Sequence, residues 1–155
     1  MPTIKMLNVM NKFVATLLLF PCIALASETC PLNGYWQSDE KQTLESFYSS
    51  ANKTEKQIEL FSKGFFGKLV VKIECEQFTS TLEGWSETTP YEILEKGNNK
   101  LTIRYIELPN DEAPTKKELH LHGQCYSVPI ISGQFREFMC KSTKETFNQQ
   151  LHRTP

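Results

Sequence analysis

The sequence of 155 residues lacks several patterns that would indicate a function. It has no cluster of lysine and arginine and a formal net charge of only −1, so nucleic acid, which is bound through basic patches, is not an expected partner. It also contains no Gly-x-Ser-x-Gly motif, no glycine-rich phosphate loop and no closely spaced pair of cysteines. These absences argue against a serine hydrolase, a phosphate-binding loop and a structural zinc site. We therefore expect no enzymatic reaction, no cofactor and no metal.

The N-terminus has the parts of a bacterial export signal. Two lysines precede an apolar run from Phe13 to Ala26, which ends in Ala24-Leu25-Ala26, the small-x-small pattern that signal peptidase recognises. The run has about 14 residues, fewer than the roughly 20 that span a bilayer. We predict a signal peptide over residues 1–26, cleavage before Ser27, and a periplasmic or secreted protein. No second apolar run follows, so no membrane span is expected after processing.

Four cysteines follow the predicted cleavage site: Cys30, Cys75, Cys125 and Cys140. An even number of cysteines in a small exported domain predicts two disulfides. A two-residue turn at Ser132-Gly133 would place Cys125 directly opposite Cys140 in a hairpin, within disulfide reach. Cys30 and Cys75 would then pair at one end of the first two strands. Cys30–Cys140 is the alternative, because a closed barrel also makes the first and last strands neighbours.

Hydrophobic alternation predicts a mainly β protein with eight strands, most of them separated by short turn sequences. The predicted strands are residues 32–38, 65–74, 77–83, 91–95, 101–106, 117–122, 125–131 and 134–141. This pattern favours an eight-stranded antiparallel up-and-down barrel, with a two-sheet sandwich as the alternative. We expect one barrel domain over residues 27–141. The polar residues 142–155 are expected to form a frayed tail.

The segment between the first two predicted strands is expected to form two short helices. Asp39 with Gln42, and Thr54 with Gln57, have the spacing of capping boxes. The apolar stripes of the two helices are Leu44, Phe47, Tyr48, Ile58 and Phe61. Because such stripes must be buried, we expect the helices to form a lid over the open mouth of the barrel, at the end opposite the disulfides.

The first strand carries a motif that resembles a known superfamily. The residues Cys30-Pro31-Leu32-Asn33-Gly34-Tyr35-Trp36 resemble the Gly-x-Trp opening of the calycins, which include lipocalins, avidins and periplasmic metalloprotease inhibitors. The stretches 34–40 and 65–69 also resemble small exported bacterial proteins described as lipocalin-like. The resemblance implies that Trp36 is a buried plug at the closed end of the barrel. It also suggests Arg136 as a cation over that ring, although the hairpin register points Arg136 away from the core.

A barrel of eight strands has room for one small ligand. The side chains expected to face its interior are Leu69, Val71, Phe78, Tyr91, Leu101, Ile103, Tyr105 and Tyr126. The sequence therefore predicts a binding protein for a small apolar ligand. A filled barrel that binds a protein partner, such as a protease or a component of the envelope, is the alternative.

A second polar pattern lies on a later strand. Glu118, His120 and His122 alternate along it, and this spacing can ligate a divalent metal. Leu119 and Leu121 lie between them and are expected to face the core, so the three polar side chains should face solvent. We interpret the pattern as the outer face of a strand.

Overall fold

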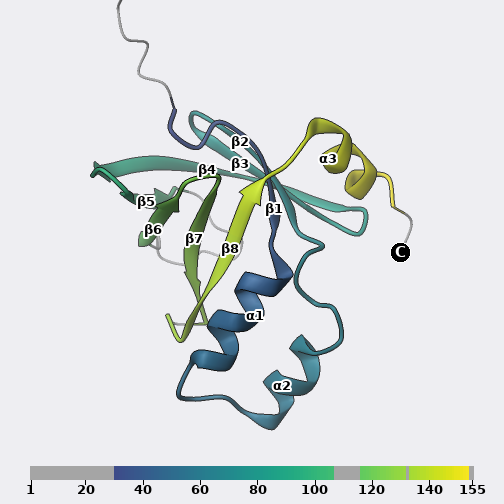
Figure 1. The fold of residues 1–155 in the computed structure, drawn as a ribbon. Coiled ribbons are helices and arrows are strands. Elements are labelled where there is room, and N and C mark those ends of the chain that lie inside the picture. The colour runs from purple at the N-terminus through teal and green to yellow at the C-terminus, as the bar shows by residue number, and fades with distance from the viewer. Residues whose placement is uncertain (1–29, 107–115, 132, 154–155) are drawn as a thin grey trace, which may run out of the picture.

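A computed structural model describes residues 30–106, 116–131 and 133–153, and the predicted signal peptide lies outside the described residues. Within them, eight antiparallel strands form a closed barrel, in which β8 pairs back to β1 (Figure 1). This confirms the up-and-down barrel. The strands are β1 (Gly34–Ser38), β2 (Val70–Glu74), β3 (Gln77–Leu82), β4 (Trp85–Lys96), β5 (Lys100–Tyr105), β6 (Lys116–His122), β7 (Cys125–Ile130) and β8 (Phe135–Lys141). The helices are α1 (Glu40–Ser49), α2 (Glu55–Phe61) and α3 (Lys144–Leu151).

Two strands differ from their predicted bounds. β2 begins at Val70 and not at residue 65, because Gly67 adopts a φ of 87° that interrupts an extended chain. β4 begins at Trp85, six residues before its predicted start at Tyr91. After Trp85, its first half consists of four polar residues and Pro90, so it shows no apolar alternation that would indicate a strand.

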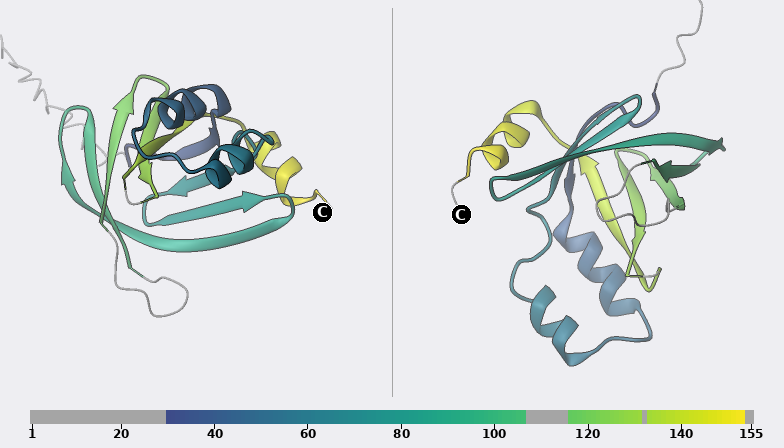
Figure 2. Two further views of the ribbon diagram at one scale, coloured as in Figure 1. Left: turned by 90° about the horizontal axis from the view of Figure 1, so that it is seen from below. Right: turned by 180° about the vertical axis from the view of Figure 1, so that it is seen from behind.

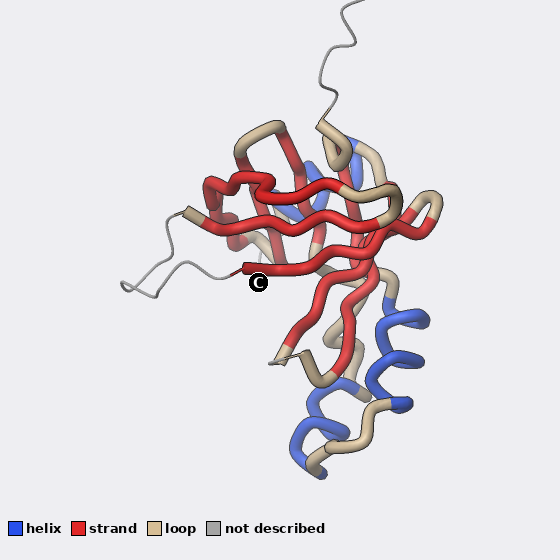
Figure 3. The backbone as a smooth tube through the Cα atoms, turned by 90° about the vertical axis from the view of Figure 1, so that its left-hand side faces the viewer, coloured by secondary structure: helices blue, strands red, loops and turns tan. Residues whose placement is uncertain are grey.

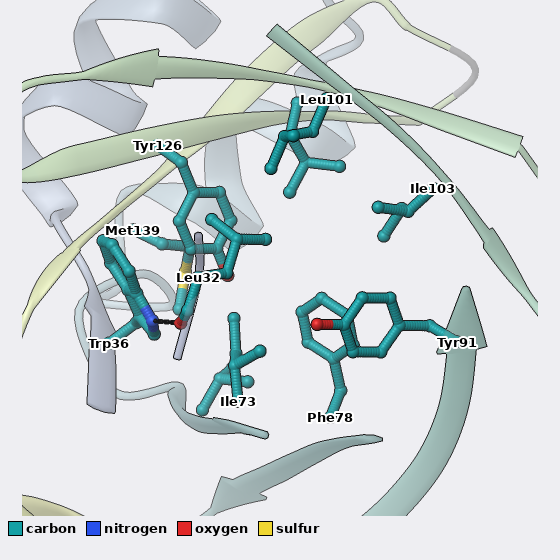
Figure 4. Close-up of a cluster of buried hydrophobic side chains, with 11 residues drawn as sticks. Leu32, Trp36, Ile73, Phe78, Tyr91, Leu101, Ile103, Tyr126 and Met139 are labelled. Carbon is teal, nitrogen blue, oxygen red and sulfur yellow. Dashed lines mark hydrogen bonds between the residues drawn. The ribbon is translucent and has the colours of Figure 1, made fainter. Parts of the chain in front are cut away.

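The end of the barrel near the start of β1 is filled by a cluster around Trp36, which is buried. Its indole Nε1 donates a hydrogen bond of 2.7 Å to the carbonyl oxygen of Leu32, a residue that is itself completely buried (Figure 4). The ring also packs edge-on against Tyr126, with 4.9 Å between centroids. Trp36 is therefore held by the chain just before its own strand, as expected for a plug.

A lysine, and not Arg136, covers the tryptophan ring. The Nζ atom of Lys141 lies 3.8 Å from the centroid of Trp36. Gly34, with a φ of 132°, leaves room for it, since a Cβ atom there would stand 3.2 Å from the lysine Nζ. Arg136 lies on the outer wall, where its Nε donates to the Ser127 hydroxyl. The glycine of the Gly-x-Trp motif, Gly34, thus makes space for the lysine above the tryptophan ring.

The helix α1 takes the place of a strand along part of β8. β1 ends at Ser38, so the next part of β8 has no strand on that side. The backbone N–H of Phe138 donates to the Thr43 hydroxyl, and that of Arg136 donates to the Ser46 hydroxyl, both at 3.0 Å. Thr43 is completely buried. The side chains of α1 therefore provide the acceptors that a neighbouring strand would otherwise supply.

The segment between β1 and β2, residues 39–69 and here called the insert, contains both predicted helices with the expected N-terminal residues. The Asp39 carboxylate accepts a hydrogen bond from the backbone N–H of Gln42, and Thr54 with Gln57 forms a complete capping box. Figure 3 shows the two helices projecting from one end of the barrel. Phe47 of α1 and Phe61 of α2 are buried in a cluster with Phe66 and with Phe135 of β8. Leu44 of α1 packs against this cluster.

Two residues of the predicted stripes do not belong to that cluster. Tyr48 and Ile58 are 48% and 40% exposed. Each helix has about two or three turns, and so short a helix buries only a narrow stripe of side chains. The prediction that Tyr48 and Ile58 are buried is therefore wrong.

Both predicted disulfides are present, Cys30–Cys75 and Cys125–Cys140. The register of the β7–β8 hairpin places Cys125 opposite Cys140, as expected. The Cys125–Cys140 bond lies on the outer wall beside the first turn of α1, where the Gln42 Nε2 atom is 3.5 Å from the Cys140 Sγ atom. The insert therefore lies at the end opposite Cys30–Cys75, as expected. It lies beside Cys125–Cys140, so the prediction that it is opposite both disulfides is wrong.

The expected frayed tail is a helix. The Thr143 hydroxyl accepts a hydrogen bond from the Thr146 N–H and begins α3. Phe147 is buried and packs against Tyr35, and the carbonyl of Gln150 accepts a hydrogen bond from the Gly84 N–H. The polar sequence concealed this helix, because only one aromatic residue, Phe147, and the polar Gln150 are buried in it.

Replacement of Trp36 tests the plug. Trp36→Ala should lower the free energy of unfolding by about 3–5 kcal/mol, as for buried aromatic residues in general. Trp85→Ala is the matched control: Trp85 is 54% exposed, and its loss should change stability by less than about 0.5 kcal/mol. Urea unfolding of the oxidised proteins measures both. Equal effects of the two substitutions would contradict the structural role of Trp36.

The helix–strand hydrogen bonds can be tested at Thr43. Thr43→Val keeps the shape of the side chain but leaves the Phe138 N–H without its acceptor, which should cost about 1–3 kcal/mol. Thr102→Val removes an exposed hydroxyl and should cost less than about 0.5 kcal/mol. Thermal unfolding gives the stabilities, and amide exchange at Phe138 should accelerate only in the first variant. Unchanged exchange would show that α1 does not protect β8.

Candidate ligand cavity in the barrel

A cavity of about 230 Å³ lies inside the barrel. It is placed toward the insert, since Ile130 both lines it and packs against the phenylalanine cluster. Its wall is mainly apolar and draws on strands β2 to β8. The lining residues are Leu69, Val71, Phe78, Ser80, Thr89, Tyr105, Leu119, Tyr126, Val128, Ile130, Glu137 and Met139.

The eight residues predicted to face the interior divide into two groups. Those that line the cavity are Leu69, Val71, Phe78, Tyr105 and Tyr126. Tyr91, Leu101 and Ile103 are instead fully packed in the core (Figure 4). The Tyr91 hydroxyl donates to the carbonyl oxygen of Glu74 and is therefore occupied by the protein itself. The barrel is thus filled on one side and hollow on the other.

The insert borders the barrel without lining its cavity. Figure 2 shows α1 and α2 beside the end of the barrel, yet neither helix contributes a residue to the cavity wall. Their apolar contact with the barrel includes Phe47 and Phe61, which pack edge-on against Phe135 of β8 at 5.2 Å and 5.7 Å between centroids. The predicted lid therefore supports the wall around the cavity and does not form its surface.

Sequence reasoning missed a carboxyl group in the wall. On β8 the side chains of Phe135, Glu137 and Met139 lie on the inward face, because side chains of a strand alternate between its two faces. The Ser38 hydroxyl donates a hydrogen bond of 2.7 Å to the Glu137 Oε1 atom. Burial raises the pKa of Glu137, and the hydrogen bond from Ser38 opposes that shift. The alternation of β8 is the signal that could have indicated this position, because Glu137 lies between the inward-facing Phe135 and Met139.

Two phenols share the cavity with this carboxyl group. Burial, with a smaller contribution from the charge of Glu137, raises the pKa of Tyr105 to about 12. Burial also raises the pKa of Tyr126, again with a contribution from Glu137. Both phenols are therefore neutral at physiological pH and available as hydrogen-bond donors or acceptors.

The triplet of Glu118, His120 and His122 makes its contacts within the outer wall. Glu118 pairs with His120 at 2.7 Å and with Lys100, and hydrogen bonds from Lys100 and His120 lower its pKa. The His122 Nε2 atom lies 3.1 Å from the Ser127 hydroxyl. Across the described ranges of the chain, no group of three or more potential ligands is placed to hold a metal ion.

The fold defines this protein as a small, closed, antiparallel barrel of eight strands, consistent with a calycin-like architecture. Comparison with protein-family models, with curated proteins and with solved structures finds no match to the chain. The calycin resemblance therefore rests on the Gly-x-Trp motif and the barrel. None of the described helices is long and apolar enough to cross a membrane.

The raised pKa of Glu137 predicts how stability changes with pH. Just above the ordinary value of 4.5, the native state holds more of the Glu137 proton than the unfolded state does. The stability contribution of this group is therefore complete at acidic pH and decreases as the pH rises through its native pKa. Tyr105 and Tyr126, which face it, titrate far above this range. Glu137→Gln should gain stability relative to the parent protein as the pH rises above 4.5.

Glu118→Gln is the matched control, because the pKa of Glu118 is lowered. The Glu118 carboxylate stabilises the native state above pH 4.5, so this variant should lose stability relative to the parent over the same rise in pH. Melting temperatures across the pH series give both differences. A Glu137→Gln difference that is constant or decreases with pH would contradict the buried carboxyl group.

Proposed function

We propose that this protein is an exported, lipocalin-like barrel that binds one small and mainly apolar ligand in the cavity inside the barrel, which strands β2 through β8 line. The observation that carries the proposal is the cavity itself, which most of the barrel strands line with apolar side chains. Core packing leaves few voids larger than a water molecule. A space of about 230 Å³ is therefore well beyond ordinary packing defects.

The size of the cavity limits the ligand. Pockets for drug-sized molecules begin at about 300 Å³, which is larger than the space available here. An apolar cavity of about 150 Å³ holds one benzene molecule. The part of the ligand that the cavity encloses is therefore compact, of about one ring with a short substituent.

The two disulfides support the proposed location. Disulfides form and persist outside the reducing cytosol, and both bonds here join cysteines that follow the predicted signal peptide. The proposal places the mature protein in the periplasm or the medium, and it assigns the protein a binding role without a reaction.

The insert favours a second candidate function, binding of a protein partner in the envelope. Four apolar side chains of the insert are 40% exposed or more: Tyr48, Ile58, Leu60 and Phe65. Exposed apolar surface is typical of interaction sites. This candidate does not need the cavity, so the two functions can be separated by variants of the cavity wall.

Ser80 and Thr79, adjacent on β3, provide a matched test. Ser80 lines the cavity, whereas Thr79 lies on the outer face and bonds to Thr88. Ser80→Phe should fill part of the cavity and weaken the binding of neutral compact probes, such as indole and ethylbenzene, by about tenfold or more. Thr79→Phe should leave binding unchanged. Ligand-observed NMR titration of the oxidised protein gives the affinities.

Absence of saturable binding of indole, of ethylbenzene and of charged compounds of similar size to the parent protein would overturn the ligand-binding function and favour the protein partner. Equal loss of binding in both variants would place the binding site outside the cavity. Native mass spectrometry of protein purified from its own host adds an independent measurement, because a retained molecule of the predicted size would identify the ligand.

A further inference from the structure

The wall of the cavity carries four hydroxyl groups and one acid. Ser80, Thr89, Tyr105 and Tyr126 contribute the hydroxyls, and Glu137 contributes the carboxyl group. Within the described part of the chain, no lysine, arginine or histidine lines the cavity. Among these lining residues, Glu137 is thus the one that can place a negative charge in the cavity wall at physiological pH.

This carboxyl group has capacity for a ligand. Ser38 donates to its Oε1 atom at 2.7 Å, and no other residue of the described ranges donates a hydrogen bond to it. A carboxylate accepts about four hydrogen bonds. The Oε2 atom of Glu137 therefore keeps its acceptor positions in a side chain that lines the cavity.

The charge of Glu137 selects among ligands. A carboxylate in an apolar wall has lost part of its hydration, and a cation that reaches it restores the lost stabilisation. A purely apolar ligand would displace the remaining water and leave the carboxylate without a partner. An acidic ligand would bring two negative charges together. The phenols of Tyr105 and Tyr126 supply no positive charge.

We infer that the cavity binds a small primary amine with an aromatic or compact apolar body, whose ammonium group donates to Glu137. The apolar wall would hold the body, and its volume of about 230 Å³ accommodates a ring with a short chain. This inference rests on the proposed ligand-binding function and adds to it the chemistry of the ligand.

Three probes of equal body and different charge test the inference on the parent protein. They are 2-phenylethylamine, 2-phenylethanol and 3-phenylpropanoate, titrated into the oxidised full chain by calorimetry at neutral pH. The amine should bind at least about tenfold more tightly than the alcohol, because hydrogen bonds to charged groups are the stronger ones. The acid should bind most weakly.

Glu137→Gln should abolish the preference for the amine while binding of the alcohol stays within about threefold of the parent value. Glu118→Gln removes the same charge from the outer wall and should preserve the preference. Circular dichroism and thermal unfolding establish that both variants are folded. The comparison of the three probes on the parent protein remains decisive if Glu137→Gln does not fold.

Each outcome has a distinct meaning. If the alcohol binds as tightly as the amine in the parent protein, the amine inference is wrong and the ligand-binding function stands. Tighter binding of the acid would also overturn the inference, since it would require a protonated Glu137 that donates to an anion. If none of the probes binds, and indole and ethylbenzene also fail, the ligand-binding function itself fails.

Discussion

The hydrogen bonds between α1 and β8 are the constraint on which the rest of this barrel depends. A closed barrel requires a partner for every strand edge, and β1 is too short to pair with all of β8. Thr43 and Ser46 of α1 accept the N–H groups of Phe138 and Arg136. Arg136 and Phe138 are the residues on either side of Glu137. The contact that completes the barrel therefore also fixes the backbone on both sides of the cavity acid.

The interior divides because its two ends are closed by different means. Near the start of β1, Trp36 and Leu32 fill the space with large side chains, and Lys141 covers the tryptophan. Toward the insert, phenylalanines from the helices pack around Phe135 and leave the barrel lumen unfilled. The hollow half is thus produced by helices that support the strand ends from outside. A longer β1 with a short hairpin would have no such supports.

The sequence predicted what depends on alternation and chain order. Strand order, the helical insert and both disulfides followed from apolar spacing and from the β7–β8 register. It did not reveal features in which one residue departs from its usual environment. Glu137 faces inward despite its charge, and α3 is docked by the buried Phe147 and Gln150 in an otherwise polar sequence. Lys141, and not the expected Arg136, covers Trp36, because the choice depends on space left by a glycine.

The positions of the disulfides have a consequence for how the barrel can open. Cys30–Cys75 ties β1 to β2, and Cys125–Cys140 ties β7 to β8. Each bond therefore joins two strands that follow one another in the chain. Neither bond crosses the contact of β8 with β1 and α1, which closes the barrel. The seam that closes the cylinder is therefore secured without covalent bonds, between segments about a hundred residues apart in the chain. Separation of β1 and α1 from β8 would therefore break neither of these two disulfides.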